Sequence, residues 1–153
     1  MGVEVGDNHY VDAAQAVGIV EKLARAKSCQ DVAAAMAIYH PDGVLESPCL
    51  GTRYVGTDIE GAIAGWFAFA PDYEVQFEGH GMDTDTLCSW GRASFTPAFT
   101  TNGAIPNGQR ASVPVFILFQ FNEGRICWES FHFDVAAVAR QCGVDASALV
   151  RAQ

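Results

Sequence analysis

The sequence lacks any run of basic residues. It contains 9 Lys and Arg against 18 Asp and Glu, which gives a formal net charge of −9. Nucleic acid and anionic membrane surfaces repel such a chain at long range. We therefore expect neither of them as a partner.

Long hydrophobic runs are also missing. No window holds 18 uninterrupted apolar residues, and the N-terminus shows no basic region followed by an apolar core. We expect a soluble, cytoplasmic protein. The five cysteines form no CxxC motif, so we expect reduced thiols rather than a disulfide framework.

The spacings typical of metal and cofactor sites are absent as well. The four histidines form no HxH or HExxH pattern, and the sequence has no GxSxG motif and no Gly-rich phosphate loop after a predicted strand. We expect no metal and no cofactor. Proton transfer by ordinary side chains is the class of catalysis that remains.

What the sequence does contain is a generous apolar fraction. Of the 153 residues, 50% are hydrophobic, 11% aromatic and only 18% charged. This length fits one domain. We predict a single domain over residues 1–153, in which residues 1–9 form a disordered or extended arm. The apolar surplus could cover a subunit interface or line a ligand cavity.

Helical patterns dominate the first half of the sequence. Apolar residues recur at helical spacing, and Ser28 and Thr57 or Asp58 are suitable N-caps. The pattern predicts, in order, helices over residues 10–27 and 29–39, a short strand over 44–47, a loop over 51–56 and a third helix from residue 58.

Beyond Pro71 the pattern changes to β-branched and aromatic alternation, which is typical of strands. Four strands are predicted, over residues 73–80, 86–100, 109–122 and 125–133. Their short turns imply antiparallel neighbours, and their length implies strong curvature. This order indicates an α+β fold in which a curved antiparallel sheet packs on N-terminal helices. The cone-shaped space between the two layers is a natural small-molecule site.

Asp134 is the leading candidate for chemistry, because it joins the last predicted strand to a short helical segment that Gly143 would end. Its carboxylate is either the N-cap of that segment or a general acid/base at the rim of an apolar pocket. His132 lies on the same face of a regular strand. It could polarise a carbonyl or relay a proton, or it could be a partly buried histidine bonded to a backbone carbonyl.

Arg92 is unusual in the middle of an apolar strand. It could hold a substrate oxyanion, or it could pair with Glu78 or Glu129 on a neighbouring strand. The three tryptophans could line the pocket or simply fill the core.

Three parts of the sequence carry a family resemblance. They are Tyr39–Pro48 with Gly56–Ile63, Pro106–Gly108 with Phe121–Ile126, and the ending Phe133–Gly143. Over roughly residues 10–145 the chain resembles the nuclear transport factor 2-like (ketosteroid isomerase-like) superfamily, and the later motifs resemble its SnoaL-like polyketide cyclase branch. The resemblance implies a cone-shaped α+β barrel that encloses a pocket.

The resemblance also implies roles for single residues. In the cyclases an Asp matching Asp134 is the acid/base of an intramolecular aldol ring closure. Ketosteroid isomerases carry their general base where this chain has Ser47, and a hydrogen-bond-donating acid near Ile117. The epoxide-hydrolase branch has an Arg and an Asp two residues apart, whereas Arg92 is followed by Ser94 here. The resemblance therefore favours cyclase-type chemistry.

From these observations we expect a small-molecule-binding protein that works as a cofactor-free cyclase or isomerase on a hydrophobic, carbonyl-bearing substrate. Asp134 is the predicted acid/base and His132 the polarising or relay group. The predicted substrate-binding residues are Ser47, Trp66, Trp90 and Phe131. The alternatives are a non-catalytic ligand-binding or structural module, in which Asp134 only caps a helix, and a hydrolase. Apolar alternation on the outer sheet face predicts a homodimer.

Overall fold

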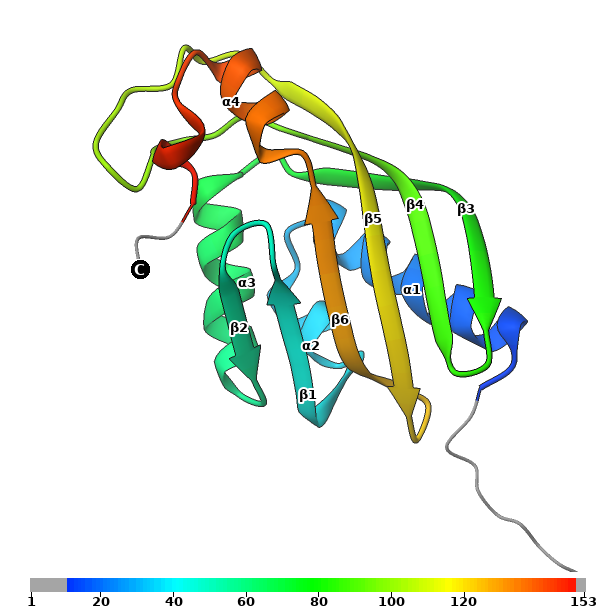
Figure 1. The fold of residues 1–153 in the computed structure, drawn as a ribbon. Coiled ribbons are helices and arrows are strands. Elements are labelled where there is room, and N and C mark those ends of the chain that lie inside the picture. Colours follow the sequence, from blue (N-terminus) through cyan, green and yellow to red (C-terminus); the bar gives the residue numbers. More distant parts are fainter. Residues whose placement is uncertain (1–10, 151–153) are drawn as a thin grey trace, which may run out of the picture.

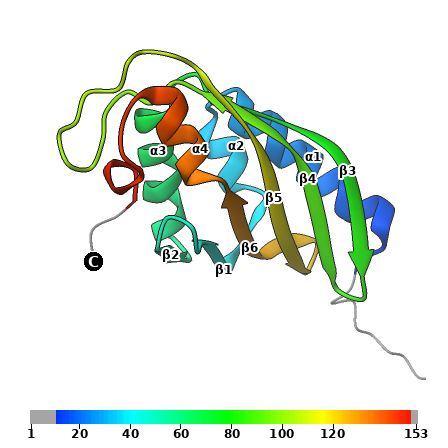
Figure 2. The ribbon, with the colours of Figure 1, turned by 45° about the horizontal axis from the view of Figure 1, so that its top comes forward.

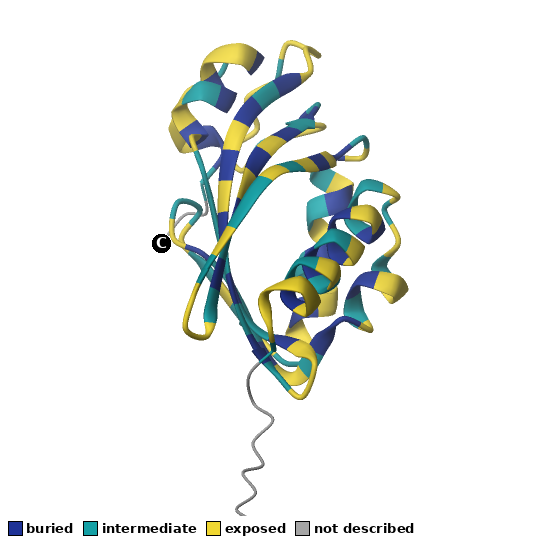
Figure 3. Cartoon of the chain, turned by 90° about the vertical axis from the view of Figure 1, so that its right-hand side faces the viewer, coloured by how far each residue is buried: buried dark blue, intermediate teal, exposed yellow. Residues whose placement is uncertain are grey.

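A single six-stranded sheet curves around three helices in the computed structural model, which describes residues 11–150 (Figure 1). The strand order is β2-β1-β6-β5-β4-β3. The helices α1, α2 and α3 lie on the concave side, and buried and exposed residues alternate along the strands (Figure 3). The predicted α+β class and the curved sheet over N-terminal helices are confirmed. The arm expected over residues 1–9 lies outside the described residues.

Helix α1 (Ala13–Ser28) begins with a capping box, in which Asp12 accepts a hydrogen bond from the Gln15 backbone N–H over 2.8 Å. Its buried residues include Ala16, Val20 and Leu23, at the spacings of four and three that place them on one face. This face packs against the sheet and so fixes the direction in which the last turn of α1 points.

The second helix is shorter than predicted. Helix α2 (Val32–Met36) is capped by Asp31, which accepts from the Ala34 backbone N–H, and not by Ser28. Ser28 belongs to the last turn of α1, and its hydroxyl accepts a hydrogen bond from the Val75 backbone N–H over 3.1 Å. Ser28, although of a residue type that often caps helices, thus bonds the backbone of a neighbouring strand instead.

The next two strands correct the prediction for this region. Strand β1 (Tyr39–Ser47) begins five residues early, and its register against β6 shifts between Tyr39 and Val44, which accommodates Pro41. The predicted loop over 51–56 contains strand β2 (Thr52–Val55), which pairs antiparallel with β1. The pair β1–β6 is parallel, so the sheet is mixed rather than purely antiparallel.

The remaining predicted elements agree closely with the observed ones, α3 (Asp58–Phe69), β3 (Glu74–Asp83), β4 (Thr86–Phe95), β5 (Ala111–Asn122), β6 (Arg125–Phe133) and α4 (Val135–Cys142). The 3₁₀ turn η1 (Ala146–Ala148) follows and was not predicted. Strand β4 ends at Phe95 rather than residue 100, because the Thr96 backbone N–H bonds the Asp72 carboxylate over 2.7 Å. Gly143 ends α4 in the left-handed conformation, with φ 74°.

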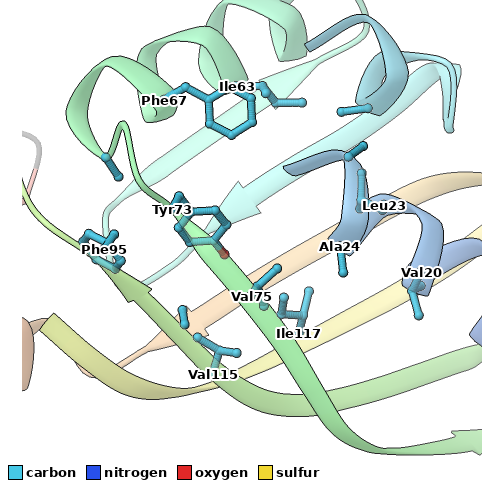
Figure 4. Close-up of a cluster of buried hydrophobic side chains, with 14 of the residues drawn as sticks. Val20, Leu23, Ala24, Ile63, Phe67, Tyr73, Val75, Phe95, Val115 and Ile117 are labelled. Carbon is cyan, nitrogen blue, oxygen red and sulfur yellow. The ribbon is translucent and has the colours of Figure 1, made fainter. Parts of the chain in front are cut away.

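The core lies between the helices and the concave sheet face. Figure 4 shows side chains that converge there from α1, α3 and the sheet, among them Val20, Leu23, Ile63, Phe67, Tyr73, Phe95, Val115 and Ile117. At one end of the sheet, near α3, the segment between β4 and β5 runs beside η1 (Figures 1 and 2), where the Thr101 backbone N–H bonds the Ala148 carbonyl. Within residues 11–150 there is no helix with the length and apolar character needed to span a membrane.

Candidate functional site

A cavity of about 680 Å³ opens between α3 and the concave face of the sheet. Residues of α1, α3, β1, β2, β6 and the segment 99–101 line it. Its volume falls within the range of small-molecule sites, about 300–1,000 Å³. The cavity lies between the sheet and the helices, where the sequence predicts a small-molecule site, and its use by a ligand stays a prediction.

Trp66 of α3 is the centre of the apolar wall. Five aromatic rings surround it at centroid distances between 5.3 and 6.2 Å, those of Phe69, Tyr73, Phe95, Phe131 and Phe133. All five contacts are edge-to-face or tilted, an arrangement that aromatic rings prefer. Trp66, Phe69, Tyr73 and Phe131 also line the cavity and give it an aromatic surface.

Glu129 is a buried carboxylate that lines this cavity, with 1% of its side chain exposed. Strand alternation places it on the same face of β6 as Phe131, the concave one. The Tyr39 hydroxyl donates a hydrogen bond to Glu129 Oε1 over 2.5 Å. A buried charge of this kind requires partners, since leaving it bare in an apolar site is costly.

Two tyrosines near Glu129 are held in the neutral form. Burial, and then the charge of Glu129, raises the pKa of Tyr39 well above its ordinary value. The same two causes raise the pKa of Tyr73. Both phenols therefore keep their protons at neutral pH, so Tyr39 donates to the carboxylate, and Tyr73 lines the cavity in its neutral form.

Lys27, in the last turn of α1, is the cationic partner of Glu129. Its Nζ lies 3.4 Å from Oε2 and 3.5 Å from Oε1, and 5.7 Å from the centroid of the Tyr39 ring. Its side chain is 14% exposed and lines the cavity. The Gln30 side chain, which donates to the backbone carbonyls of Lys27 and Tyr73, ties this turn to the start of β3.

Three of the predicted substrate-binding residues line the cavity, namely Ser47, Trp66 and Phe131. Ser47 is 5% exposed, and its hydroxyl donates to the Phe131 carbonyl over 2.8 Å. The Ser47 hydroxyl proton is therefore already engaged in this hydrogen bond. Ser47 shapes the wall and joins β1 to β6 at the cavity.

The other three predicted site residues lie elsewhere. Asp134 is exposed and accepts a hydrogen bond from the Ala137 backbone N–H over 3.0 Å, which is the contact of an N-cap. His132 contacts the Ser130 hydroxyl, 2.8 Å away. Trp90 lies over Gly79 and is 38% exposed. None of the three lines the cavity, so the structure does not bring Asp134 and His132 together with Trp66 and Phe131.

Arg92 does not pair with Glu129. It is exposed, and its guanidinium donates to the Ser112 hydroxyl over 3.1 Å. Glu129 instead takes its cation from α1, 102 residues away in sequence. Sequence reasoning missed Glu129, Tyr39 and Lys27 as a group, although a lone Glu within the apolar stretch 126–133 was a signal that one face of this strand carries a buried charge.

No group of three or more His, Cys, Asp or Glu side chains within residues 11–150 is arranged to hold a metal ion. All five cysteines are free, and only Cys142 is fully buried. The charged residues that line the cavity are Lys27 and the carboxylates Glu129, Glu46 and Asp58, and hydroxyl-bearing residues such as Tyr73 also belong to the lining. Such a set can exchange protons and hydrogen-bond a polar ligand atom.

Sequence comparison decides the family. The model of the SnoaL-like domain matches residues 20–129, more than half of the chain. The chain belongs to the SnoaL-like family. The resemblance found in its motifs is therefore confirmed, and this SnoaL-like chain has no match among curated proteins.

Solved structures share the fold of this SnoaL-like chain at low identity. A putative SnoaL-like polyketide cyclase from Jannaschia sp. CCS1 is 19% identical, with a TM-score of 0.74 over 92% of this chain and 97% of that one. AclR, a putative hydroxylase from Streptomyces galilaeus, is 17% identical, with a TM-score of 0.73 over 86% and 98%. An LEH-like epoxide hydrolase from M. tuberculosis is 19% identical, with a TM-score of 0.67 over 84% and 90%. These likenesses establish the nuclear transport factor 2-like fold and leave the reaction to the site itself.

Proposed function

We propose that this protein is a cofactor-free cyclase or isomerase-type enzyme that moves a proton on a hydrophobic, carbonyl-bearing small molecule, with Glu129 as the general acid/base. The observation that carries the proposal is the position of Glu129. Its carboxylate is buried in a cavity whose walls are otherwise mostly aromatic and aliphatic. A positioned carboxylate of this kind contributes a factor of roughly 10²–10⁴ to a proton transfer.

The neighbours of Glu129 suit this role. Tyr39 donates to one carboxylate oxygen and so fixes the orientation of the group, while the other oxygen has only the longer contact with Lys27. Glu129 takes the proton next to the substrate carbonyl, and the Lys27 ammonium faces the oxygen on which negative charge develops. Return of the proton to another carbon isomerises the substrate. Attack of the enolate on a second carbonyl of the same molecule closes a ring.

The cavity favours neutral substrates. Among residues 11–150, Lys27 is the only Lys or Arg that lines it, and this cation already faces Glu129. Two further carboxylates, Glu46 and Asp58, also belong to the lining. A carboxylate or phosphate on the substrate would therefore meet an unfavourable field. Planar apolar compounds with ketone or phenol oxygens fit the aromatic wall around Trp66.

In this proposal Glu129 takes the role that the sequence predicts for Asp134. The acid/base role of Asp134 and the relay role of His132 stay predictions, and they require contacts with substrate outside the cavity. The capping bond from Ala137 accounts for Asp134 without any chemistry.

A binding module without catalysis is the second candidate, and one observation favours it. Glu129 already has both Tyr39 and Lys27 as partners, and a fully satisfied buried charge can be purely structural. The two candidates differ in whether the carboxylate exchanges protons with a ligand in the cavity.

Deuterium exchange tests the proposal without knowledge of the natural substrate. 2-Tetralone, a neutral bicyclic ketone, exchanges the protons next to its carbonyl with D₂O, and NMR measures the rate. The protein should accelerate this exchange, and Glu129→Gln, which keeps the size and hydrogen-bonding capacity of the side chain, should remove the acceleration. A parent protein that binds 2-tetralone without accelerating the exchange would favour the binding module, and a Glu129→Gln protein that accelerates it as much as the parent would contradict the role of Glu129.

A further inference from the structure

We propose that Lys27 is a nucleophile that captures carbonyl compounds in the cavity as Schiff bases. The inference rests on the proposed use of the same cavity for carbonyl compounds, and it adds a covalent activity to acid/base chemistry. It follows from where the two lysines of this chain lie and from the contacts that Lys27 makes.

The sequence contains only two lysines, Lys22 and Lys27, both on α1. Lys22 is exposed, whereas the Lys27 side chain is 14% exposed, lines the cavity and places its amino group 3.4 Å from the Glu129 carboxylate. An apolar cavity concentrates carbonyl compounds beside an amine that lines it. Enzymes that form Schiff bases use lysine in this way.

The contacts of Lys27 leave room for a ligand. Both of its distances to Glu129, 3.4 and 3.5 Å, are long for a charge-assisted hydrogen bond, which is ordinarily about 2.7–2.9 Å. Glu129 has its short contact with Tyr39 instead. The ammonium is therefore loosely held, and its remaining N–H groups can reach a ligand oxygen.

Glu129 is also the group that can take a proton from the Lys27 ammonium. The reactive form of lysine is neutral, and the carboxylate 3.4 Å away is the nearest acceptor for the proton.

Lys27 and Glu129 together supply every proton transfer that Schiff-base formation requires. The Lys27 ammonium gives a proton to the Glu129 carboxylate. The nitrogen lone pair then bonds the carbonyl carbon, while the π pair of the C=O bond moves to the oxygen, which takes the proton from Glu129. Loss of the second N–H proton and of the hydroxyl as water leaves the C=N bond. No oxidant or reductant is required, and addition of water reverses the sequence.

Reductive trapping tests this inference directly. The folded protein is incubated with 6-methoxy-2-naphthaldehyde, a neutral aromatic aldehyde, and sodium cyanoborohydride, which delivers hydride to the imine carbon and makes the adduct permanent. Peptide mapping by mass spectrometry then compares the labelling rates of Lys27 and Lys22 in the same sample. We expect Lys27 to be labelled at least about tenfold faster than Lys22, because the cavity brings aldehyde and amine together.

Lys27→Arg is the matched control, since it keeps the positive charge beside Glu129 but cannot form an imine. In this variant the labelling rate of Lys22 should be unchanged, and the adduct at position 27 should be absent. Equal labelling of the two lysines, or labelling of Lys22 alone, would overturn the inference. Because trapping needs no turnover, such a failure leaves the acid/base role of Glu129 standing if Glu129→Gln still abolishes deuterium exchange.

Discussion

The Tyr39 hydroxyl donates a hydrogen bond to Glu129 Oε1 over 2.5 Å, and this bond joins residues 90 positions apart in the sequence. Tyr39 is the first residue of β1 and Glu129 lies in β6, the parallel neighbour of β1. The bond therefore depends on the register of the only parallel strand pair in the described sheet. It supplies the buried carboxylate of the cavity with a neutral donor.

Replacement of Tyr39 should reduce stability. Tyr39→Phe removes the donor to a buried carboxylate, and hydrogen bonds to charged groups contribute about 1.5–3 kcal/mol. We expect a loss of that size in the free energy of unfolding, measured by urea denaturation. Tyr73→Phe is the control, because within residues 11–150 no hydrogen bond to the Tyr73 hydroxyl is found. An equal effect of the two substitutions would contradict the proposed contribution of the Tyr39 bond.

The two buried tyrosines predict a loss of stability in alkali. Both have a pKa raised above the ordinary value of 10.0, first by burial and then by the charge of Glu129. Below pH 10 their contribution is fully present. Above it the unfolded chain releases phenolic protons that the folded chain retains, so the free energy of unfolding falls by up to about 1.4 kcal/mol per pH unit for each tyrosine.

Urea denaturation between pH 8 and pH 11 measures this slope. The double variant with Tyr39→Phe and Tyr73→Phe should show a flatter decline over the same range. A parent protein whose stability is constant up to pH 11 would show that the phenols are not buried as the structure has them.

Asp134 should behave as a helix cap. Asp134→Asn keeps an oxygen that accepts from the Ala137 backbone N–H, so it should change the free energy of unfolding by at most about 1 kcal/mol. Asp134→Ala removes the acceptor and should cost about 0.5–2 kcal/mol. Thermal or urea unfolding of the pair measures the difference. Equal stability of the two variants would show that the capping bond contributes little.

The outer face of the sheet predicts self-association. Trp90 and Phe116 are directly paired across β4 and β5, and they are 38% and 54% exposed. His132 pairs with Phe116 from the other side. Two copies that bring these surfaces together would remove adjacent large aromatic side chains from water, which supports the predicted homodimer.

Sedimentation velocity at micromolar concentration tests this prediction. The parent protein should sediment as a dimer and Phe116→Glu as a monomer, because a charge at the centre of an apolar contact is costly to bury. A parent mass near 16.4 kDa would exclude the homodimer under these conditions.

Most of the fold could be predicted from local signals in the sequence. The N-caps, the Pro-Asp turn after α3 and the β-branched alternation predicted α3, β3, β5, β6 and α4 to within a few residues. Strand β2 was missed because its four residues show no apolar alternation and become a strand only by pairing with β1. The same holds for the start of β1, where pairing with β6 overrides the turn signal of Pro41.

The site was harder to predict because its polar groups come from three distant elements. Trp66 and Phe131 were found by their size, but Glu129 was considered only as one of two possible partners of Arg92. Periodicity indicates which face of a strand a residue occupies, and it cannot indicate that the last turn of α1 delivers Lys27 to that face. That contact depends on the packing of α1 against the sheet.

Proton abstraction from 5-nitrobenzisoxazole is the measurement that tests the central claim most directly. This compound is neutral and planar and has no carbonyl group, so it cannot form a Schiff base with Lys27. A base that removes its ring proton breaks the O–N bond and releases a coloured phenolate. We predict that Glu129→Gln lowers the cavity-dependent rate by at least about 10²-fold, the lower end of the range for a general base, whereas Asp134→Asn leaves it unchanged. An unchanged rate in Glu129→Gln together with a loss in Asp134→Asn would contradict the account and return the acid/base role to Asp134.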